Sequence, residues 1–132
     1  DRYLYIRNFE PERWPGGTPN YKNAYLDKSW YGDIDNGPTK FYMWKNRKKP
    51  GVKHLFKLGF GKRPAEELYD LEKDPDQLNN VAGDESYAEV RKKLSARLMR
   101  KLKENEDPRA TGEGEKFDNY PYYGGTPSWP WD

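Results

Sequence analysis

The chain has 132 residues, of which 33% are hydrophobic, 16% aromatic and 35% charged, and its formal net charge is +2. The charge is too balanced to indicate a polyanion partner by itself, and the absence of cysteine excludes disulfides, thiolate metal sites and thiol nucleophiles. The chain contains no run of about 18 apolar residues, which a membrane-spanning helix would need. The aromatic content is too high for a disordered chain, so the composition predicts one small domain with a core rich in Tyr and Trp.

The first element is predicted over residues 2–9, RYLYIRNF. Apolar side chains alternate along it, with Tyr3 and Tyr5 on one face and Leu4 and Ile6 on the other, which is typical of a strand covered on both sides. The chain lacks an initiator Met and begins inside this pattern. We therefore expect the natural N-terminus to lie further upstream, so a missing signal peptide says nothing about export.

Residues 10–37 are predicted to form a long irregular arm, because Pro and Gly recur through its first half. Arms of this length are commonly functional or laid over a neighbouring surface. Aromatic side chains spaced along the arm favour the second interpretation, since each ring can bury a large area against a neighbouring surface. The ring-bearing residues are Trp14, Tyr21, Tyr25, Trp30 and Tyr31.

Two short helices are predicted next. The first opens at Gly37-Pro38-Thr39, with Thr39 as the expected N-cap, and Pro50-Gly51 should stop it. The second lies within Val52–Phe60, where apolar residues recur at helical spacing. It should end near Gly59 and Gly61.

The segment Lys62–Ala82, KRPAEELYDLEKDPDQLNNVA, is called the joint below. Its alternating run at 66–71, EELYDL, predicts the second strand. Asp74-Pro75 predicts the turn that follows. None of these residues forms a recognisable reaction centre, so the joint is interpreted as a connection between two elements.

The end of the joint, residues 77–82, is predicted as a loose helical turn with Leu78 and Val81 inward. A long helix should follow over 85–105, since Ser86 and Glu89 have the spacing of a capping box. Asp84 is a rival cap. The apolar stripe of this helix comprises Tyr87, Val90, Leu94, Leu98, Met99 and Leu102.

The opposite face of the long helix is basic but interrupted by acidic residues, which favours a solvated face over a nucleic-acid platform. We therefore expect no nucleic-acid partner. The lack of a long apolar run predicts no membrane partner. Residues 109–132 form a second aromatic arm. Its ring-bearing anchors are Phe117, Tyr120, Tyr122, Tyr123, Trp129 and Trp131.

Three candidate sites have plainer explanations. Asp33–Gly37 resembles the opening of a calcium loop, but position 44 is Trp where such a loop needs a bidentate Glu, so an Asx turn is favoured. His54 is the single histidine, and it has no partner pattern for metal binding or nucleophile activation. A carbohydrate-binding module would normally show many short strands, and these are not predicted.

Four blocks of the sequence resemble the C-terminal end of the sulfatase family, especially bacterial heparan N-sulfatase-like and other polysaccharide sulfatases. The third block is the most specific, because it joins a strand ending in ELYDL to a D-P turn and an N-N-V-A exit. Together the blocks run through nearly the whole chain. They are RYLYIRNFEPERW at 2–14, GDIDNGPTK at 32–40, FGKRPAEELYDLEKDPDQLNNVAGDESYAEV at 60–90 and DPRATGEGEKFDNYPYYGG at 107–125.

The resemblance implies a two-part enzyme. In sulfatases a large N-terminal α/β domain carries a formylglycine, made within a C/S-x-P-x-R motif, together with a calcium ion, and it attacks the sulfate ester or sulfamate. The smaller C-terminal subdomain is a short antiparallel sheet with a long helix packed on it. Ser128-Trp-Pro130-Trp-Asp132 imitates the motif, but Asp132 stands where Arg is required. No catalytic residue and no metal ligand is carried over to this chain.

The resulting expectation is an α+β subdomain over residues 1–132 that is inactive alone and supports a sulfatase catalytic domain. It would meet sulfated carbohydrate through the parent enzyme, whose localisation by resemblance is periplasmic or secreted. Its bare docking surface would invite self-association. The alternative is a stand-alone carbohydrate- or protein-binding module. Residues predicted to contact substrate, for their positive or donor character, are Arg7, Lys40, His54 and Arg63.

Overall fold

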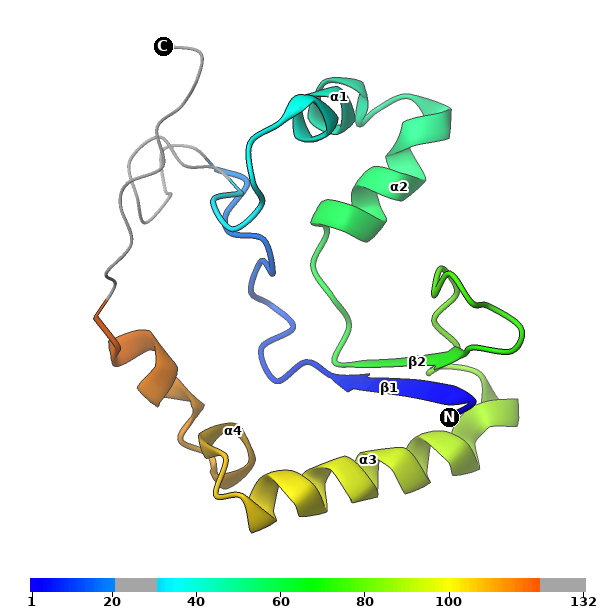
Figure 1. Cartoon of the computed structure of the whole chain (residues 1–132), viewed down its shortest axis with the longest axis vertical. Helices are drawn as coiled ribbons and strands as arrows, with labels where there is room; N and C mark the ends of the chain where they lie inside the picture. The colour runs from blue at the N-terminus through cyan, green and yellow to red at the C-terminus, as the bar shows by residue number, and fades with distance from the viewer. Residues whose placement is uncertain (21–30, 122–132) are drawn as a thin grey trace. The chain divides into compact units, whose positions relative to one another are not determined.

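The computed structural model describes residues 1–20 and 31–121. The chain divides into two compact units (Figure 1). The first unit comprises Asp1–Phe9 and Pro64–Tyr123, and the second comprises Glu10–Arg63 and Gly124–Asp132. A small antiparallel sheet and a long helix make the fold class α+β, as the sequence predicts.

The sheet of the first unit has two strands, β1 (Tyr3–Arg7) and β2 (Glu66–Asp70). They pair antiparallel, with Tyr3 opposite Asp70 and Arg7 opposite Glu66. Both predicted strands are confirmed, each with slightly narrower bounds. The last four residues of β2 are buried, whereas the first four of β1 are only half-buried and its last is exposed. Strand β1 is therefore less covered than its two apolar faces predict.

The joint turns back along the free edge of β2. Its turn is organised by Asp74, whose carboxylate accepts from the backbone N–H groups of Leu78 at 3.1 Å and Asn79 at 2.7 Å. The predicted helical turn at 77–82 is wrong. The segment is irregular, Leu78 is 46% exposed, and the N–H of Val81 donates to the carbonyl of Leu68 at 2.9 Å instead of to a helical partner.

Asn80 explains why this segment is extended along the strand. Its Oδ1 accepts from the N–H groups of Leu68 and Ala82, each at 2.9 Å, and its Nδ2 donates to the carbonyl of Glu66 at 3.2 Å. One amide side chain thus satisfies backbone groups that an edge strand would otherwise leave unpaired. The extended backbone offers more bonds to β2 than a helical turn would.

Helix α3 (Ala88–Glu104) follows a single 3-10 turn, η2 (Glu85–Tyr87). Asp84 caps η2, because its carboxylate accepts from the N–H of Ser86 at 2.8 Å, and Tyr87 is the N-cap residue of α3 itself. The predicted capping box on Ser86 is wrong, since the hydroxyl of Ser86 donates to Asp84 at 2.8 Å and caps nothing. The helix ends at Glu104, as predicted.

Helix α3 packs against β1, and the rings of Tyr3 and Tyr87 meet edge to face with centroids 6.3 Å apart. No residue of α3 is fully buried, although the predicted apolar stripe is half-buried along its whole length. A sheet of two short strands is too narrow to cover a helix of 17 residues. Within the first unit, therefore, the stripe keeps part of its apolar area exposed.

The chain continues after α3 as α4 (Pro108–Thr111) and the 3-10 helix η3 (Gly114–Asn119). Asp107 caps α4 by accepting from the N–H of Arg109 at 2.9 Å. The start of the predicted aromatic arm therefore carries short helices. Phe117 and Tyr120 contact each other edge to face and are exposed. The remaining predicted anchors, from Tyr122 onward, lie outside the described residues.

The second unit begins with a turn-rich loop. In its described part, the N–H of Tyr31 donates to the carbonyl of Thr18 at 2.8 Å, and that of Asp33 donates to Gly16 at 3.3 Å. Gly17 has φ +87°, and a Cβ there would lie 2.9 Å from the N of Gly32. Glycine is required at this close approach. Tyr21, Tyr25 and Trp30 lie outside the described residues.

Two helices complete the described part of this unit, α1 (Pro38–Asn46) and α2 (Pro50–Phe60). Proline occupies the first position of each, where its missing N–H costs nothing. The N-cap residue of α1 is Gly37, so the prediction of Thr39 is wrong. Pro50 begins α2, two positions before the predicted start, and the helix ends at Phe60 with Gly61 as its C-cap, near the predicted end.

The apolar core of the second unit is built on Tyr31, which is 4% exposed. Its ring meets those of Phe60, Phe56 and Trp14 edge to face, with centroids 5.1, 6.3 and 6.4 Å apart. Burial raises the pKa of the Tyr31 hydroxyl. Two of the predicted anchors, Trp14 and Tyr31, therefore pack inside their own unit.

Candidate functional site

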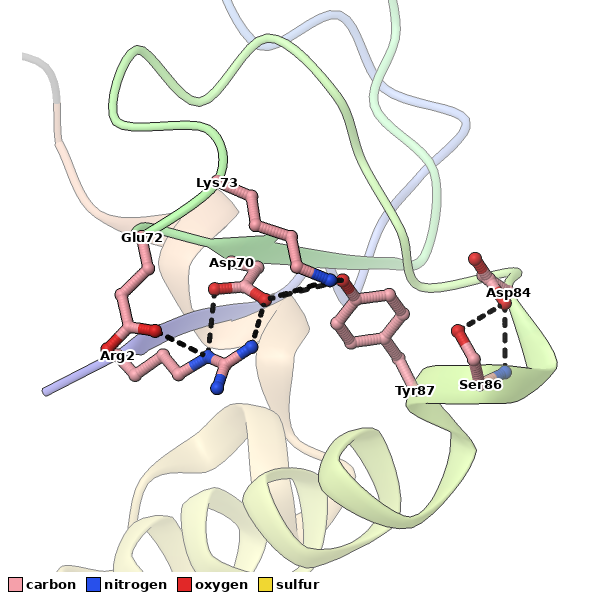
Figure 2. Close-up of polar contacts among 7 residues, drawn as sticks. All are labelled: Arg2, Asp70, Glu72, Lys73, Asp84, Ser86 and Tyr87. Atoms are coloured by element: carbon pink, nitrogen blue, oxygen red, sulfur yellow. Dashed lines mark hydrogen bonds and ion pairs between the residues drawn. The ribbon is translucent and has the colours of Figure 1, made fainter.

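The densest polar cluster in the described residues surrounds Asp70, at the end of β2 (Figure 2). The guanidinium of Arg2 donates Nε to Oδ1 at 3.0 Å and its terminal nitrogen to Oδ2 at 2.7 Å. Tyr87 donates its hydroxyl to Oδ2 at 3.3 Å. Lys73 donates to that hydroxyl at 2.9 Å, and Glu72 lies 3.3 Å from Arg2.

The electrostatics of this cluster favour a carboxylate that is ionised at neutral pH. Hydrogen bonding from Arg2 lowers the pKa of Asp70, and the same bonds raise the pKa of Arg2. The Tyr87 hydroxyl raises the pKa of Lys73. Asp70 is only 2% exposed, so its oxygens are occupied by the protein's own donors.

Its position shows what this cluster can do. Arg2 precedes β1, Asp70 ends β2, and Tyr87 lies at the start of the long helix. A bidentate pair with a third donor fixes the relative direction of three elements. The cluster is therefore a clasp within the first unit, and a carboxylate held in this way is unsuited to exchange protons at neutral pH.

The four predicted substrate-contact residues fall in different surroundings. Lys40, on α1, is 4% exposed, and its ammonium donates to the carbonyls of Tyr31 and Ile34 at 3.0 and 2.7 Å and to Oδ1 of Asn36 at 3.0 Å. Burial lowers its pKa. The loop that resembles a calcium site thus turns its oxygens toward an internal ammonium, which gives Lys40 a structural task.

The other three predicted residues are more accessible. Arg7 lies in the first unit, where its guanidinium is 3.5 Å from Glu66 and 5.9 Å from the ring of Phe9. His54 is exposed on α2, and Arg63 is half-buried after that helix. Their contact with substrate stays a prediction.

Residues 38–63 carry a signal that the sequence analysis overlooked. They contain lysine and arginine but no aspartate or glutamate, so α1, α2 and their links have charge of one sign. This segment is called the basic helix pair below. Lys40, His54 and Arg63 belong to it. Its cationic residues are Lys40, Lys45, Arg47, Lys48, Lys49, Lys53, Lys57, Lys62 and Arg63.

Metal-binding groups and membrane-spanning helices are absent from the part of the chain that the structure describes. No group of three or more His, Cys, Asp or Glu residues there could hold a metal ion. None of the helices in residues 1–20 and 31–121 has the length and apolar character needed to cross a membrane.

Comparison with known proteins adds no relative: a scan against models of protein families and searches of curated proteins and of solved structures find no match to the chain.

Proposed function

We propose that the chain is the C-terminal, non-catalytic portion of a sulfatase, a hydrolase of sulfate esters or sulfamates. In this role it supports a catalytic domain and helps line the cleft that receives a sulfated polysaccharide. The formylglycine and the calcium ion belong to the catalytic domain. Arg7, Lys40, His54 and Arg63 remain the predicted substrate contacts, although the three internal acceptors of Lys40 favour a structural task for that residue.

The observation that carries the proposal is the construction of the joint. The residues that make its sequence block specific each have a separate physical task. Leu68 is fully buried in β2, Asp74 holds the turn, and Asn80 closes the edge of the strand. Three distinctive residues of the block thus have separate structural tasks, which supports the resemblance.

The arrangement of the first unit gives further support. The resemblance implies a short antiparallel sheet with a long helix packed on it, and β1, β2 and α3 have this arrangement. The half-buried apolar stripe of α3 suits a subdomain that completes its packing on a larger partner. A free-standing domain would bury that stripe itself.

The deciding experiment is to read the same gene upstream of Asp1. The proposal expects a C/S-x-P-x-R motif a few hundred residues earlier, within an α/β domain. A signal peptide followed directly by the present sequence would refute it.

A second experiment assays the isolated chain on an aryl sulfate. We expect no turnover, because the chain lacks the cysteine form of the nucleophile motif and its one S-x-P sequence has Asp132 in place of Arg. Turnover above both a blank and a heat-killed control would mean that the chain carries a reaction centre of its own. The proposal would then be wrong.

The alternative function is a stand-alone binding module for carbohydrate or protein. One observation favours it: the basic helix pair offers exposed cations and rings without help from another domain. The upstream sequence separates the two functions, since a module needs no catalytic domain in the same gene.

A further inference from the structure

We propose that the basic helix pair, residues 38–63, is a binding surface for a linear sulfated polysaccharide. The choice of a sulfated polymer rests on the proposed function, whereas the anionic and extended character of the ligand rests on this surface alone. The surface would hold the polymer along α1 and α2 without taking part in hydrolysis.

The first step of the argument is the exposure of the charges. Inward positions of the two helices are filled by Lys40, Asn46, Val52 and Phe60, which are buried. The other six lysines of the segment are exposed: Lys62, and a group of five made up of Lys45, Lys48, Lys49, Lys53 and Lys57. Their ammonium groups are therefore available to a ligand.

The second step is that these charges are not neutralised by neighbours. None of the lysines in the group of five forms an ion pair with a residue in the ranges 1–20 and 31–121. In this segment Lys62 does so, at 3.0 Å from Glu12. A one-signed cluster attracts an anionic polymer and releases its condensed counterions on binding, which gives affinity that does not depend on a shaped pocket.

The third step concerns the arrangement of the lysines. Lys49, Lys53 and Lys57 recur at intervals of four, with Lys49 as the N-cap residue of α2, so they follow one side of the helix from its start. The row is about 12 Å long at 1.5 Å per residue. A row of point charges suits repeated anionic groups along a chain better than it suits a single small anion. The ligand is accordingly extended.

The fourth step separates polysaccharide from nucleic acid. Tyr42 is 60% and Trp44 39% exposed on α1. Residues two apart on a helix do not share a face, so these rings cannot form the continuous platform on which successive bases stack. The guanidinium of Arg47 lies 4.4 Å from the centroid of the Trp44 ring, so the more exposed ring of Tyr42 is the one that can cover the apolar face of a sugar. The surface therefore favours a sulfated polysaccharide over a single-stranded nucleic acid.

The test measures binding of fluorescein-labelled heparin, a sulfated polysaccharide, to the full 132-residue chain in 50 mM salt. The variant K49Q/K53Q/K57Q removes the row from α2. Its matched control, K93Q/R97Q/K101Q, removes three positive charges at the same spacing from α3, where Lys101 already lies 2.7 Å from Glu104. Each variant changes the net charge by the same amount.

We expect the α2 variant to weaken heparin binding by about ten-fold or more, and the α3 control by less than about three-fold. The difference should shrink as salt is raised, because the interaction is screened. Desulfated heparin should bind at least about ten-fold more weakly than heparin. Far-UV circular dichroism verifies that both variants remain folded.

Equal losses in the two variants would overturn the proposal, because net charge alone would then explain binding. Absence of heparin binding by the unmodified chain would also overturn it, as would tighter binding of a 20-nucleotide oligo-dT, which would assign the surface to nucleic acid. If heparin binds as expected but no sulfatase motif lies upstream, the proposed function fails and this surface stands. If the motif is present and heparin does not bind, the reverse holds.

Discussion

The two units use their polar side chains in opposite ways. In the first unit, polar side chains near the sheet bond to the protein's own groups: Asp70 is held by Arg2 and Tyr87, and Asn80 closes the edge of β2. In the second unit, Lys40 is satisfied internally, while the other lysines of α1 and α2 are exposed. The contrast separates charges that hold the fold from charges left for a ligand.

Helix α3 makes the contrast sharper, because it is also rich in basic residues. Its two acids, Glu89 and Glu104, lie near the two ends of the helix, and Glu104 is 2.7 Å from Lys101 and 3.9 Å from Arg100. Basic content alone therefore does not mark a binding surface. The basic helix pair differs because its 26 residues contain no acid at either end or between the helices.

The largest effect is expected for Leu68→Ala. Leu68 is fully buried at the centre of β2, so the substitution leaves a cavity and should lower the free energy of unfolding by about 2–5 kcal/mol. Urea denaturation followed by far-UV circular dichroism gives the size, and native-state hydrogen exchange locates it. Amides of β2 and α3 should lose protection before those of α2 do.

The control for this prediction is Leu55→Ala in α2. Leu55 is 48% exposed, so its loss should change stability by no more than about 0.5 kcal/mol. If the two substitutions lower the free energy of unfolding by the same amount, the contrast between an organised first unit and an exposed helix pair fails.

A smaller effect is expected for Asn80→Ala. The substitution removes three hydrogen bonds to backbone groups and should cost about 1–3 kcal/mol. Faster exchange of the Leu68 amide is the direct signature, because that N–H loses its acceptor. Asn79→Ala is the matched control: Asn79 is exposed and contributes its backbone N–H to the turn, so stability should change by less than about 0.5 kcal/mol. Equal losses would contradict the account of the joint.

The clasp predicts a loss of stability in acid. Asp70 has a pKa below its ordinary value of 3.8, chiefly because of Arg2. Its contribution is thus complete above the unfolded-state value and is lost as pH falls through 3.8 toward the folded-state value. Urea titrations between pH 7 and pH 3 should show a smaller loss for Asp70→Asn than for the unmodified chain. Parallel curves would show that the clasp does not contribute.

Hydrophobic periodicity predicted most of the architecture. The strands at β1 and β2 and the end of α3 near Asn105 follow from local patterns, because each depends on residues close in sequence. The starts of α1, α2 and α3 were each misplaced by a few residues, because several nearby residues could cap or begin a helix. The helical turn predicted at 77–82 failed for another reason, since a side chain there bonds to backbone far from it in sequence. Asn80 reaches residues 12 and 14 positions earlier, and no periodicity reports such a bond.

The candidate surface was missed for a different reason. Net charge was judged over the whole chain, and a balance of +2 hid a segment of 26 residues without an acid. Net charge calculated for short segments, rather than for the whole chain, identifies residues 38–63 as a basic surface. By contrast, the burial of Lys40 could not be predicted, because it depends on loop oxygens from Tyr31, Ile34 and Asn36 that converge only in the folded unit.

The smallest effect is expected at the start of the long helix, where Asp84 and Ser86 were rival caps. Asp84→Ala removes the acceptor for the N–H of Ser86 and should cost about 1 kcal/mol. Ser86→Ala removes only a hydroxyl that donates to Asp84, so it should cost a few tenths of a kcal/mol. Thermal unfolding of both variants at pH 7 measures the difference. The opposite order would restore the capping box. It would also remove Asp84 from the group of first-unit polar side chains that hold the fold, which would narrow the contrast with the basic helix pair.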